Sequence, residues 1–243
     1  GDIMIDVCGN SAGLLTVEFW GPMACFCPPY AKVDRLSYAV PTPSALRGML
    51  ASVYCKPAEF WWAIRKIEIM RPIKYLSVRR NEVKRRLSDR GMRPIDVTAC
   101  RTQRAMTVLK DVRYRGTAQI TPADGCRRPL AALTDQAVRR FEKGQCFQQP
   151  YLGLRECICD FALSDGLGRP IQESMDLNLM VFDTHVPYDN RKNAPFSSSL
   201  YHAVMQDGVI LVPDYDSPEV IKLGRGILAG PAEGSDAYVA GTV

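Results

Sequence analysis

The spacing of apolar positions predicts two strands and a helix in the first part of the chain. In residues 14–20, apolar side chains occupy alternate positions, as in a strand with one buried face, and the pattern ends at a Gly-Pro pair. Thr42 and Pro43 form a helix start, and apolar residues then recur at helical spacing as far as Val53. Residues 63–69 alternate again, which predicts the second strand.

The second half of the core is predicted after a long basic insertion. Residues 108–120 are rich in strand-forming side chains, and residues 133–141 have helical spacing, with Gly144 placed to cap the helix end. Residues 152–163 predict a further strand. The order β-α-β-β-α-β indicates an α+β fold of the ferredoxin-like type, which also underlies RNA-recognition domains.

A change of composition predicts a second region after this core. Beyond residue 163 the chain becomes acidic and rich in Gly, Pro and Asp, with short strand candidates at residues 177–182 and 209–212. We therefore expect a ferredoxin-like RNA-binding domain in residues 1–163, interrupted by the basic insertion. A small, acidic, antiparallel β-rich C-terminal region is expected in residues 164–243.

The overall composition is that of an ordinary globular protein. The chain has 243 residues, of which 47% are hydrophobic and 23% are charged, and this balance excludes disorder of the whole chain. Its apolar runs end far short of the roughly 18 residues that a membrane span needs. The first residues show no basic segment followed by an apolar one, so we expect a cytoplasmic protein with no membrane partner.

Cysteine usage argues against both disulfides and a metal site. The nine cysteines are an odd number, and the only close pairs are Cys25 with Cys27 and Cys157 with Cys159. Zinc sites usually use longer spacings, and only two histidines are present, so we expect reduced thiols and no metal. Neither a Walker A motif nor a GxGxxG motif occurs, so we expect no cofactor.

Charge becomes informative once the chain is divided. Residues 65–115 contain 16 Lys and Arg against five acids, a net charge of +11, whereas residues 160–243 contain 12 acids and five bases, a net charge of −7. A basic segment this dense attracts phosphates and releases their counterions on binding. Nucleic acid is therefore the expected partner, and the alternative is a solvated basic loop without a ligand.

Nine short motifs follow one another in the order found in a known family. They are VDRLSY at 33–38, PTPSALRG at 41–48, YCKP at 54–57, RPI at 71–73, VRRNEV at 78–83, RTQRA at 101–105, GQCF at 144–147, PYLGLRE at 150–156 and AVMQDGVI at 203–210. Over roughly residues 13–220 the chain thereby resembles the handle-binding subunit of type I-C CRISPR systems, the fifth Cas family of the RAMP superfamily.

This resemblance implies a role in antiviral defence. The subunit would bind the 5′ repeat-derived handle of CRISPR RNA (crRNA) in the Cascade surveillance complex, contact the backbone and large subunits, and meet target DNA only indirectly through the complex. It also implies an endoribonuclease that cuts precursor crRNA without a metal. Such chemistry needs a base, a cation and an acid, which the family supplies with the Tyr of YxKP and a Lys-His pair at the start of the second helix.

These catalytic residues carry over only in part. Tyr54 matches, but the Lys and His positions fall on Ala132 and Leu133, or on Ala131 and Ala132 after a one-residue slip. Natural loss, engineered inactivation and replacement by neighbouring basic residues all remain open. The candidate replacements are Arg127, Arg128 and Lys143. We expect tight RNA binding without efficient cutting, and an active endoribonuclease is the alternative.

Side chains in these motifs and in the basic insertion are expected to contact RNA. They are Lys32, Arg35, Tyr38, Arg47, Lys56, Arg79, Arg80, Lys84, Arg85, Arg86, Arg101, Arg104 and Arg155. The pair Arg155-Glu156 is compatible with either an internal ion pair or a handle contact. Trp61 and Trp62 could stack on bases, but core packing is favoured because neighbouring strand residues face opposite ways.

Overall fold

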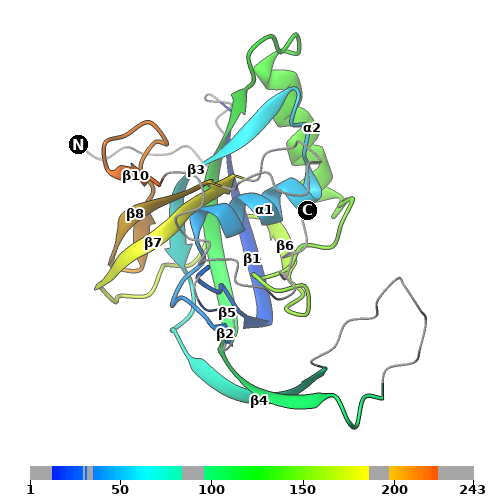
Figure 1. Ribbon diagram of the computed structural model, residues 1–243. Coiled ribbons are helices and arrows are strands. Elements are labelled where there is room, and N and C mark those ends of the chain that lie inside the picture. Colours follow the sequence, from blue (N-terminus) through cyan, green and yellow to red (C-terminus); the bar gives the residue numbers. More distant parts are fainter. Residues whose placement is uncertain (1–12, 30, 32–34, 84–95, 186–196, 224–243) are drawn as a thin grey trace.

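The computed structural model describes residues 13–29, 31, 35–83, 96–185 and 197–223. These residues form a mixed α+β fold with a mainly antiparallel sheet and two helices (Figure 1). In chain order the elements are β1 (Leu14–Ala24), β2 (Arg35–Leu36), α1 (Pro43–Val53), β3 (Phe60–Ile69), β4 (Tyr75–Val83), β5 (Arg101–Pro122), α2 (Leu130–Glu142), β6 (Asp160–Leu163), β7 (Met175–His185), β8 (Ser197–Gln206), β9 (Val209–Leu211) and β10 (Val220–Lys222).

The described strands form one sheet around β5. Its main path runs β10-β8-β9-β3-β5-β1-β6, while β2 and β4 also pair with β5, and β7 pairs with β8. Only the short pairing of β2 with β5 is parallel. The register places Val17 and Ile67 on either side of Gly116, so these three residues share one face of the sheet.

The start of α1 and the end of α2 lie where the sequence predicts them. The Thr42 hydroxyl accepts a hydrogen bond from the Ala45 amide at 3.1 Å, which caps α1. Helix α2 is followed by Gly144 with a φ of +60°, a conformation that favours glycine. Helix α1 packs so closely on β5 that a Cβ at Gly116 would come within 2.4 Å of the Leu46 side chain.

Two segments differ from the sequence expectation. Strand β1 continues through the Gly21-Pro22 pair, because Gly21 still pairs with Val112 and Met23 with Lys110. The strand predicted for residues 152–163 was too long, since β6 covers only Asp160–Leu163. Gly153 turns the chain before it with a φ of +85°, and a Cβ there would lie 2.0 Å from the Cys25 carbonyl oxygen.

Part of the basic insertion is a β-hairpin rather than a loop. Strand β4 pairs along its whole length with the first half of β5, from Tyr75 opposite Leu109 to Val83 opposite Arg101. Together, residues 75–83 and 101–109 form an arm that curves away from the body of the molecule (Figure 1). The charge of this segment was predicted from the sequence, but the pairing of its two strands was not.

The strands after residue 163 extend the same sheet. Strand β9 pairs with β3, with Ile210 opposite Ile67. Buried Met180, Tyr201 and Met205 belong to the same hydrophobic cluster as the core side chains of β1 and α1. The division of the chain at residues 163 and 164 stays a prediction, but deleting the later strands would uncover part of this cluster.

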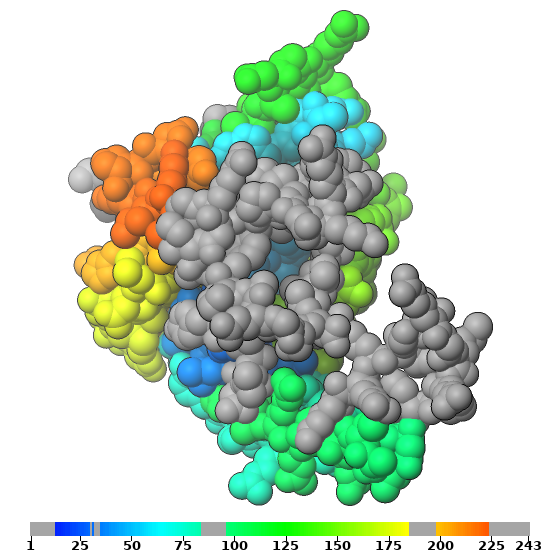
Figure 2. Space-filling model, viewed as in Figure 1, coloured from blue at the N-terminus to red at the C-terminus, as the bar shows by residue number. Residues whose placement is uncertain are grey.

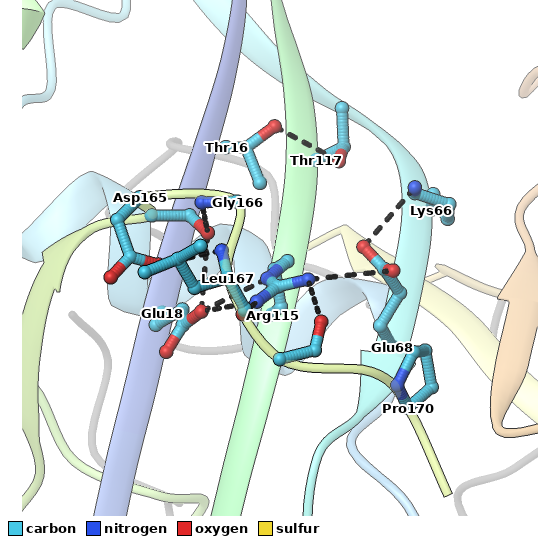
Figure 3. Close-up of polar contacts among 12 residues, drawn as sticks. Thr16, Glu18, Lys66, Glu68, Arg115, Thr117, Asp165, Gly166, Leu167 and Pro170 are labelled. Atoms are coloured by element: carbon cyan, nitrogen blue, oxygen red, sulfur yellow. Dashed lines mark hydrogen bonds and ion pairs between the residues drawn. The ribbon is translucent and has the colours of Figure 1, made fainter. Parts of the chain in front are cut away.

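A buried ionic network occupies the sheet face opposite α1 (Figure 3). Arg115 Nε donates to Glu18 Oε1 at 2.9 Å, and its Nη1 lies 3.9 Å from Glu68 Oε1. The same guanidinium donates to the carbonyls of Leu167 and Gly168, which close over this face. Burial alone would raise the pKa of Glu18, but the hydrogen bonds from Arg113 and Arg115 outweigh it and lower the pKa.

Candidate nucleic-acid interface

The outer face of the arm carries exposed basic side chains. Arg79 on β4 and Arg101 on β5 are both exposed, and neither forms an ion pair with a residue that the structure describes. Strand alternation places them on the same side of the arm, because Arg79 lies opposite Ala105 and Arg101 opposite Val83. The predicted contacts Lys84, Arg85 and Arg86 lie outside the described residues, as does Lys32.

The inner face of the arm is joined to the body by what we call the arginine cluster. It consists of three arginines and two glutamates, namely Arg35, Arg80, Arg104, Glu82 and Glu156. Glu156 accepts hydrogen bonds from Arg80 and, at 3.0 Å, from Arg35. Glu82 lies 3.4 Å from Arg35 and 3.4 Å from Arg104. Three predicted RNA contacts therefore converge here, with a formal charge of +1.

The cluster accounts for Glu156 but not for Arg155. Glu156 forms internal ion pairs, although with Arg35 and Arg80 rather than with its neighbour. The hydrogen bond to Glu156 raises the pKa of Arg80. Arg155 is exposed and remains a candidate contact with the handle.

Three further predicted contacts do not belong to the cluster. Arg47 on α1 pairs with Asp183 of β7 through both of its terminal nitrogens. Lys56 Nζ lies 3.8 Å from Glu59 Oε1 in the turn between α1 and β3. Tyr38 is half-buried and lines a pocket beside α1. Trp62 is core, as favoured, whereas Trp61 is 45% exposed.

Tyr54 lies in an apolar setting at the end of α1. Its side chain is 3% exposed, and its ring packs on Phe60 with a centroid distance of 4.9 Å. The guanidinium carbon of Arg140 lies 5.9 Å from the Tyr54 ring centre. Burial raises the pKa of Tyr54 against the charge of Arg128, so the phenol is neutral at pH 7. Its buried hydroxyl has no hydrogen-bond partner among the described residues.

The positions of the missing Lys-His pair differ in exposure and direction. Leu133 is fully buried, Ala132 is half-buried and Ala131 is exposed. Leu133 precedes Arg140 by seven residues, about two helical turns, so both occupy the face of α2 that points toward Tyr54. Ala131 lies on the opposite face.

Basic residues near Tyr54 are arginines rather than a Lys-His pair. Arg128 is exposed, lies 3.3 Å from Glu59 and acts electrostatically on Tyr54. Arg127 and Lys143 are also exposed. Arg140 was missed by the sequence reasoning, and its helical spacing from Leu133 is the signal that could have found it. His202 of β8 lies far from this helix in sequence, and its Nε2 is 2.8 Å from Asp176 Oδ1 of β7.

Other candidate chemistry in the described part of the chain is limited. Cys25 and Cys27 have their sulfur atoms 3.3 Å apart. Among the described residues, no group of three or more His, Cys, Asp or Glu side chains is arranged to hold a metal ion. Neither described helix is long and apolar enough to cross a membrane.

Replacing Tyr54 with Phe is expected to raise the free energy of unfolding by about 1 kcal/mol, because a buried hydroxyl without a partner is removed while the ring packing is kept. Urea denaturation measures this change. Tyr75→Phe, at an exposed position on the arm, is the matched control and should change stability little. A clear loss of stability for Tyr54→Phe would show that the hydroxyl has a hydrogen-bond partner.

Comparisons with known proteins identify relatives over most of the chain. A family model described as CRISPR-associated protein (Cas_Cas5), under the name Cas_Cas5d, matches residues 14–213. The CRISPR pre-crRNA endoribonuclease Cas5d of Mannheimia succiniciproducens is 36% identical over 229 residues, covering 86% of this chain and 99% of the relative. The protein of the same description from Thermus thermophilus is 35% identical over 229 residues, covering 89% and 98%.

Two solved structures share the fold. One is described as a CRISPR-associated protein and the other as the functionally uncharacterized protein SMU1763c from Streptococcus mutans. Each has a TM-score of 0.62 and 21% sequence identity, and each match covers 86% of this chain. The matches cover 96% and 97% of the two solved chains, respectively. At this identity the likeness concerns the fold alone.

Proposed function

Because this chain belongs to the Cas5 family of CRISPR-associated proteins, in its Cas5d branch, we propose that it binds the 5′ handle of crRNA as a subunit of a type I-C Cascade complex. The observation that carries this proposal is the basic arm, whose outer face presents Arg79 and Arg101 to solvent. Exposed guanidinium groups on a hairpin are suited to binding RNA phosphates.

We also assign the centre of the sheet to the ferredoxin-like type. The assignment is supported by the order β3-β5-β1-β6, in which every neighbouring pair is antiparallel. It is further supported by the helices, since α1 connects β1 to β3 and α2 connects β5 to β6. In this arrangement the arm extends β5 beyond the end of its pairing with β1 and β3, where it can reach RNA without disturbing the packed sheet.

The C-terminal strands are assigned to protein contacts rather than to RNA. Their exposed acids would repel phosphate, and these acids are Asp176, Asp207, Asp214, Asp216 and Glu219. In the view of Figure 2, the C-terminal segment (orange) and the arm (cyan to green) lie at different ends of the molecule. We infer that this acidic end faces the backbone or large subunits of Cascade, and that target DNA is met only through the complex.

The alternative function is cleavage of precursor crRNA. It is favoured by the relatives described as pre-crRNA endoribonucleases and by Tyr54 in the YxKP motif. In such a reaction the ribose 2′-oxygen attacks phosphorus, the bond to the 5′-oxygen breaks, and a proton passes from the first oxygen to the second through acid and base groups. Arginine can stabilise the phosphorane, but at neutral pH it is a poor acid or base. Binding without efficient cutting is therefore the favoured function.

Replacing both Arg79 and Arg101 with Gln is expected to weaken binding of all RNA sequences by a similar factor. It should also reduce the slope of log Kd against log salt by about 0.7 for each lost contact with single-stranded RNA. Fluorescence anisotropy at several salt concentrations measures both effects. The double variant Arg139→Gln, Arg169→Gln removes the same charge from exposed positions outside the arm. An unchanged slope, or an equal change in this control, would contradict the proposal.

A further inference from the structure

A pocket opens beside the exposed side of α1. Its walls come from segments far apart in the sequence, including Phe26 and Cys27 after β1, Tyr38, Tyr151 and Val181 of β7. Its cavity volume is about 270 Å³, close to the lower end of the range of about 300–1,000 Å³ that is usual for small-ligand sites. The pocket is separate from Tyr54, which does not line it.

Gly48 forms part of the pocket wall and has no evident structural reason to be glycine. It lies in the interior of α1, where glycine is unfavourable relative to alanine. A Cβ built at Gly48 meets no described atom within 4 Å, whereas a Cβ at Gly116 or Gly153 would collide with its neighbours. The packing of the described chain therefore leaves the space above Gly48 open, on the side that faces the pocket.

The pocket adjoins the arginine cluster. Arg35 lies three residues before Tyr38, which lines the pocket and donates its backbone N–H to the carbonyl of Phe26, another lining residue, at 2.9 Å. The pKa of Cys27 in the pocket wall is lowered by its hydrogen bond with Cys25 and by the charge of Arg35, against the effects of burial and of Glu156. Arg35 also belongs to the arginine cluster, where three guanidinium groups face two carboxylates. The pocket thus adjoins a cluster of side chains with a net formal charge of +1.

The lining and the charge point to the same class of ligand. Phe26, Tyr38 and Tyr151 supply aromatic rings around a space bordered by small residues of α1. Proteins bind unpaired nucleotides by combining aromatic surfaces for the bases with cationic groups for the backbone. An apolar peptide segment would use the rings but not the adjacent positive charge.

We propose that this pocket receives the base of one unpaired nucleotide of the bound RNA, while the adjoining phosphate binds the arginine cluster. The inference rests on the proposed RNA-binding function and adds a base-binding subsite to it. The base occupies the space above Gly48. The phosphate competes with Glu156 and Glu82 for Arg35, so these carboxylates hold the guanidinium group in place until RNA arrives.

Filling the pocket tests the proposal. The probe is a fluorescent single-stranded RNA with the repeat sequence of the CRISPR array from the same genome, together with a series in which one nucleotide at a time is abasic. Gly48→Leu should lower affinity for the intact RNA about tenfold or more, the effect of losing one stacked base. One abasic position should lower the affinity of the unaltered protein by a similar factor. For Gly48→Leu the same abasic position should cause almost no further loss.

Stability measurements separate this effect from misfolding. Gly48→Leu should not lower the melting temperature, because leucine is a better helix former and the space around Gly48 is open. Gly48→Ala should bind RNA nearly as the unaltered chain does, since one methyl group leaves most of the pocket free. Ala131→Leu, at an exposed position on α2, is the control for an added apolar side chain.

The outcomes distinguish this inference from the function on which it rests. If the unaltered protein binds the repeat RNA but Gly48→Leu binds it equally well, the pocket proposal fails and the proposed function stands. Losses that are additive with every abasic position would also overturn it, because the pocket would then hold something other than a base. If the unaltered protein does not bind the repeat RNA, both proposals fail.

Discussion

Replacing Ala132 with Lys and Leu133 with His is expected to speed metal-independent cleavage of repeat RNA by about 10²-fold or more. Each general acid or base typically contributes about 10² to 10⁴ in rate, and the unaltered chain lacks both members of the pair. Position 133 lies on the same face of α2 as Arg140, which approaches the Tyr54 ring. The two new side chains would supply an acid and a base, which the buried Tyr54 hydroxyl, without a partner among the described residues, lacks.

The matched control carries the same two side chains one residue earlier. In Ala131→Lys with Ala132→His, the lysine is placed on the opposite, exposed face of α2, so little gain in rate is expected. Single-turnover cleavage of labelled RNA in EDTA measures both variants. The active variant should acquire a limb near pH 6 to 7 in its rate profile, and adding Tyr54→Phe should remove most of the gain.

Stability has to be followed alongside this rate. Leu133 is fully buried, so its replacement by His is expected to cost about 2–5 kcal/mol of unfolding free energy, similar to other losses of a buried leucine. Cleavage is therefore compared at a temperature at which both double variants are folded. Fast, EDTA-resistant cleavage by the unaltered chain, abolished by Tyr54→Phe, would show that other groups already serve as its acid and base.

Replacing Arg115 with Met is expected to lower the free energy of unfolding by about 3–5 kcal/mol. The change leaves Glu18 buried with a weakened set of partners and removes the pairing of Glu68 across the sheet (Figure 3). The carbonyls of Leu167 and Gly168 also lose their donor. Urea denaturation measures the loss. Arg113→Met removes another partner of Glu18, but its side chain is 43% exposed, so a much smaller loss is expected.

The pH dependence gives this prediction a second readout. The pKa of Glu18 is lowered in the folded protein, so its contribution to stability is present above the unfolded pKa and is lost as the pH falls through the folded pKa. In Arg115→Met, burial acts with less opposition and shifts the pKa of Glu18 upward. The stability deficit of the variant should therefore shrink in acid, below about pH 4. Equal deficits at pH 7 and pH 3 would contradict a role for this ion pair.

The sequence was sufficient for the local elements of the core and for the family. The cap at Thr42, the helix end at Gly144 and the alternation in β1 depend on residues within a few positions of one another, so they can be predicted from local spacing. The net charge of residues 65–115 also predicted an anionic partner without knowledge of the fold.

Tertiary structure decided which of these residues meet. The arm was missed because two of the three half-buried positions of β4 carry charged side chains, Arg80 and Glu82, so the sequence there shows no apolar alternation. Glu156 reaches Arg35, 121 residues away, only because β2, β4 and the segment before β6 converge. The strand predicted for residues 152–163 is shorter in the structure because the chain turns at Gly153, which lies close to the Cys25 carbonyl. Such contacts join residues distant in the chain, and local side-chain spacing carries no information about them.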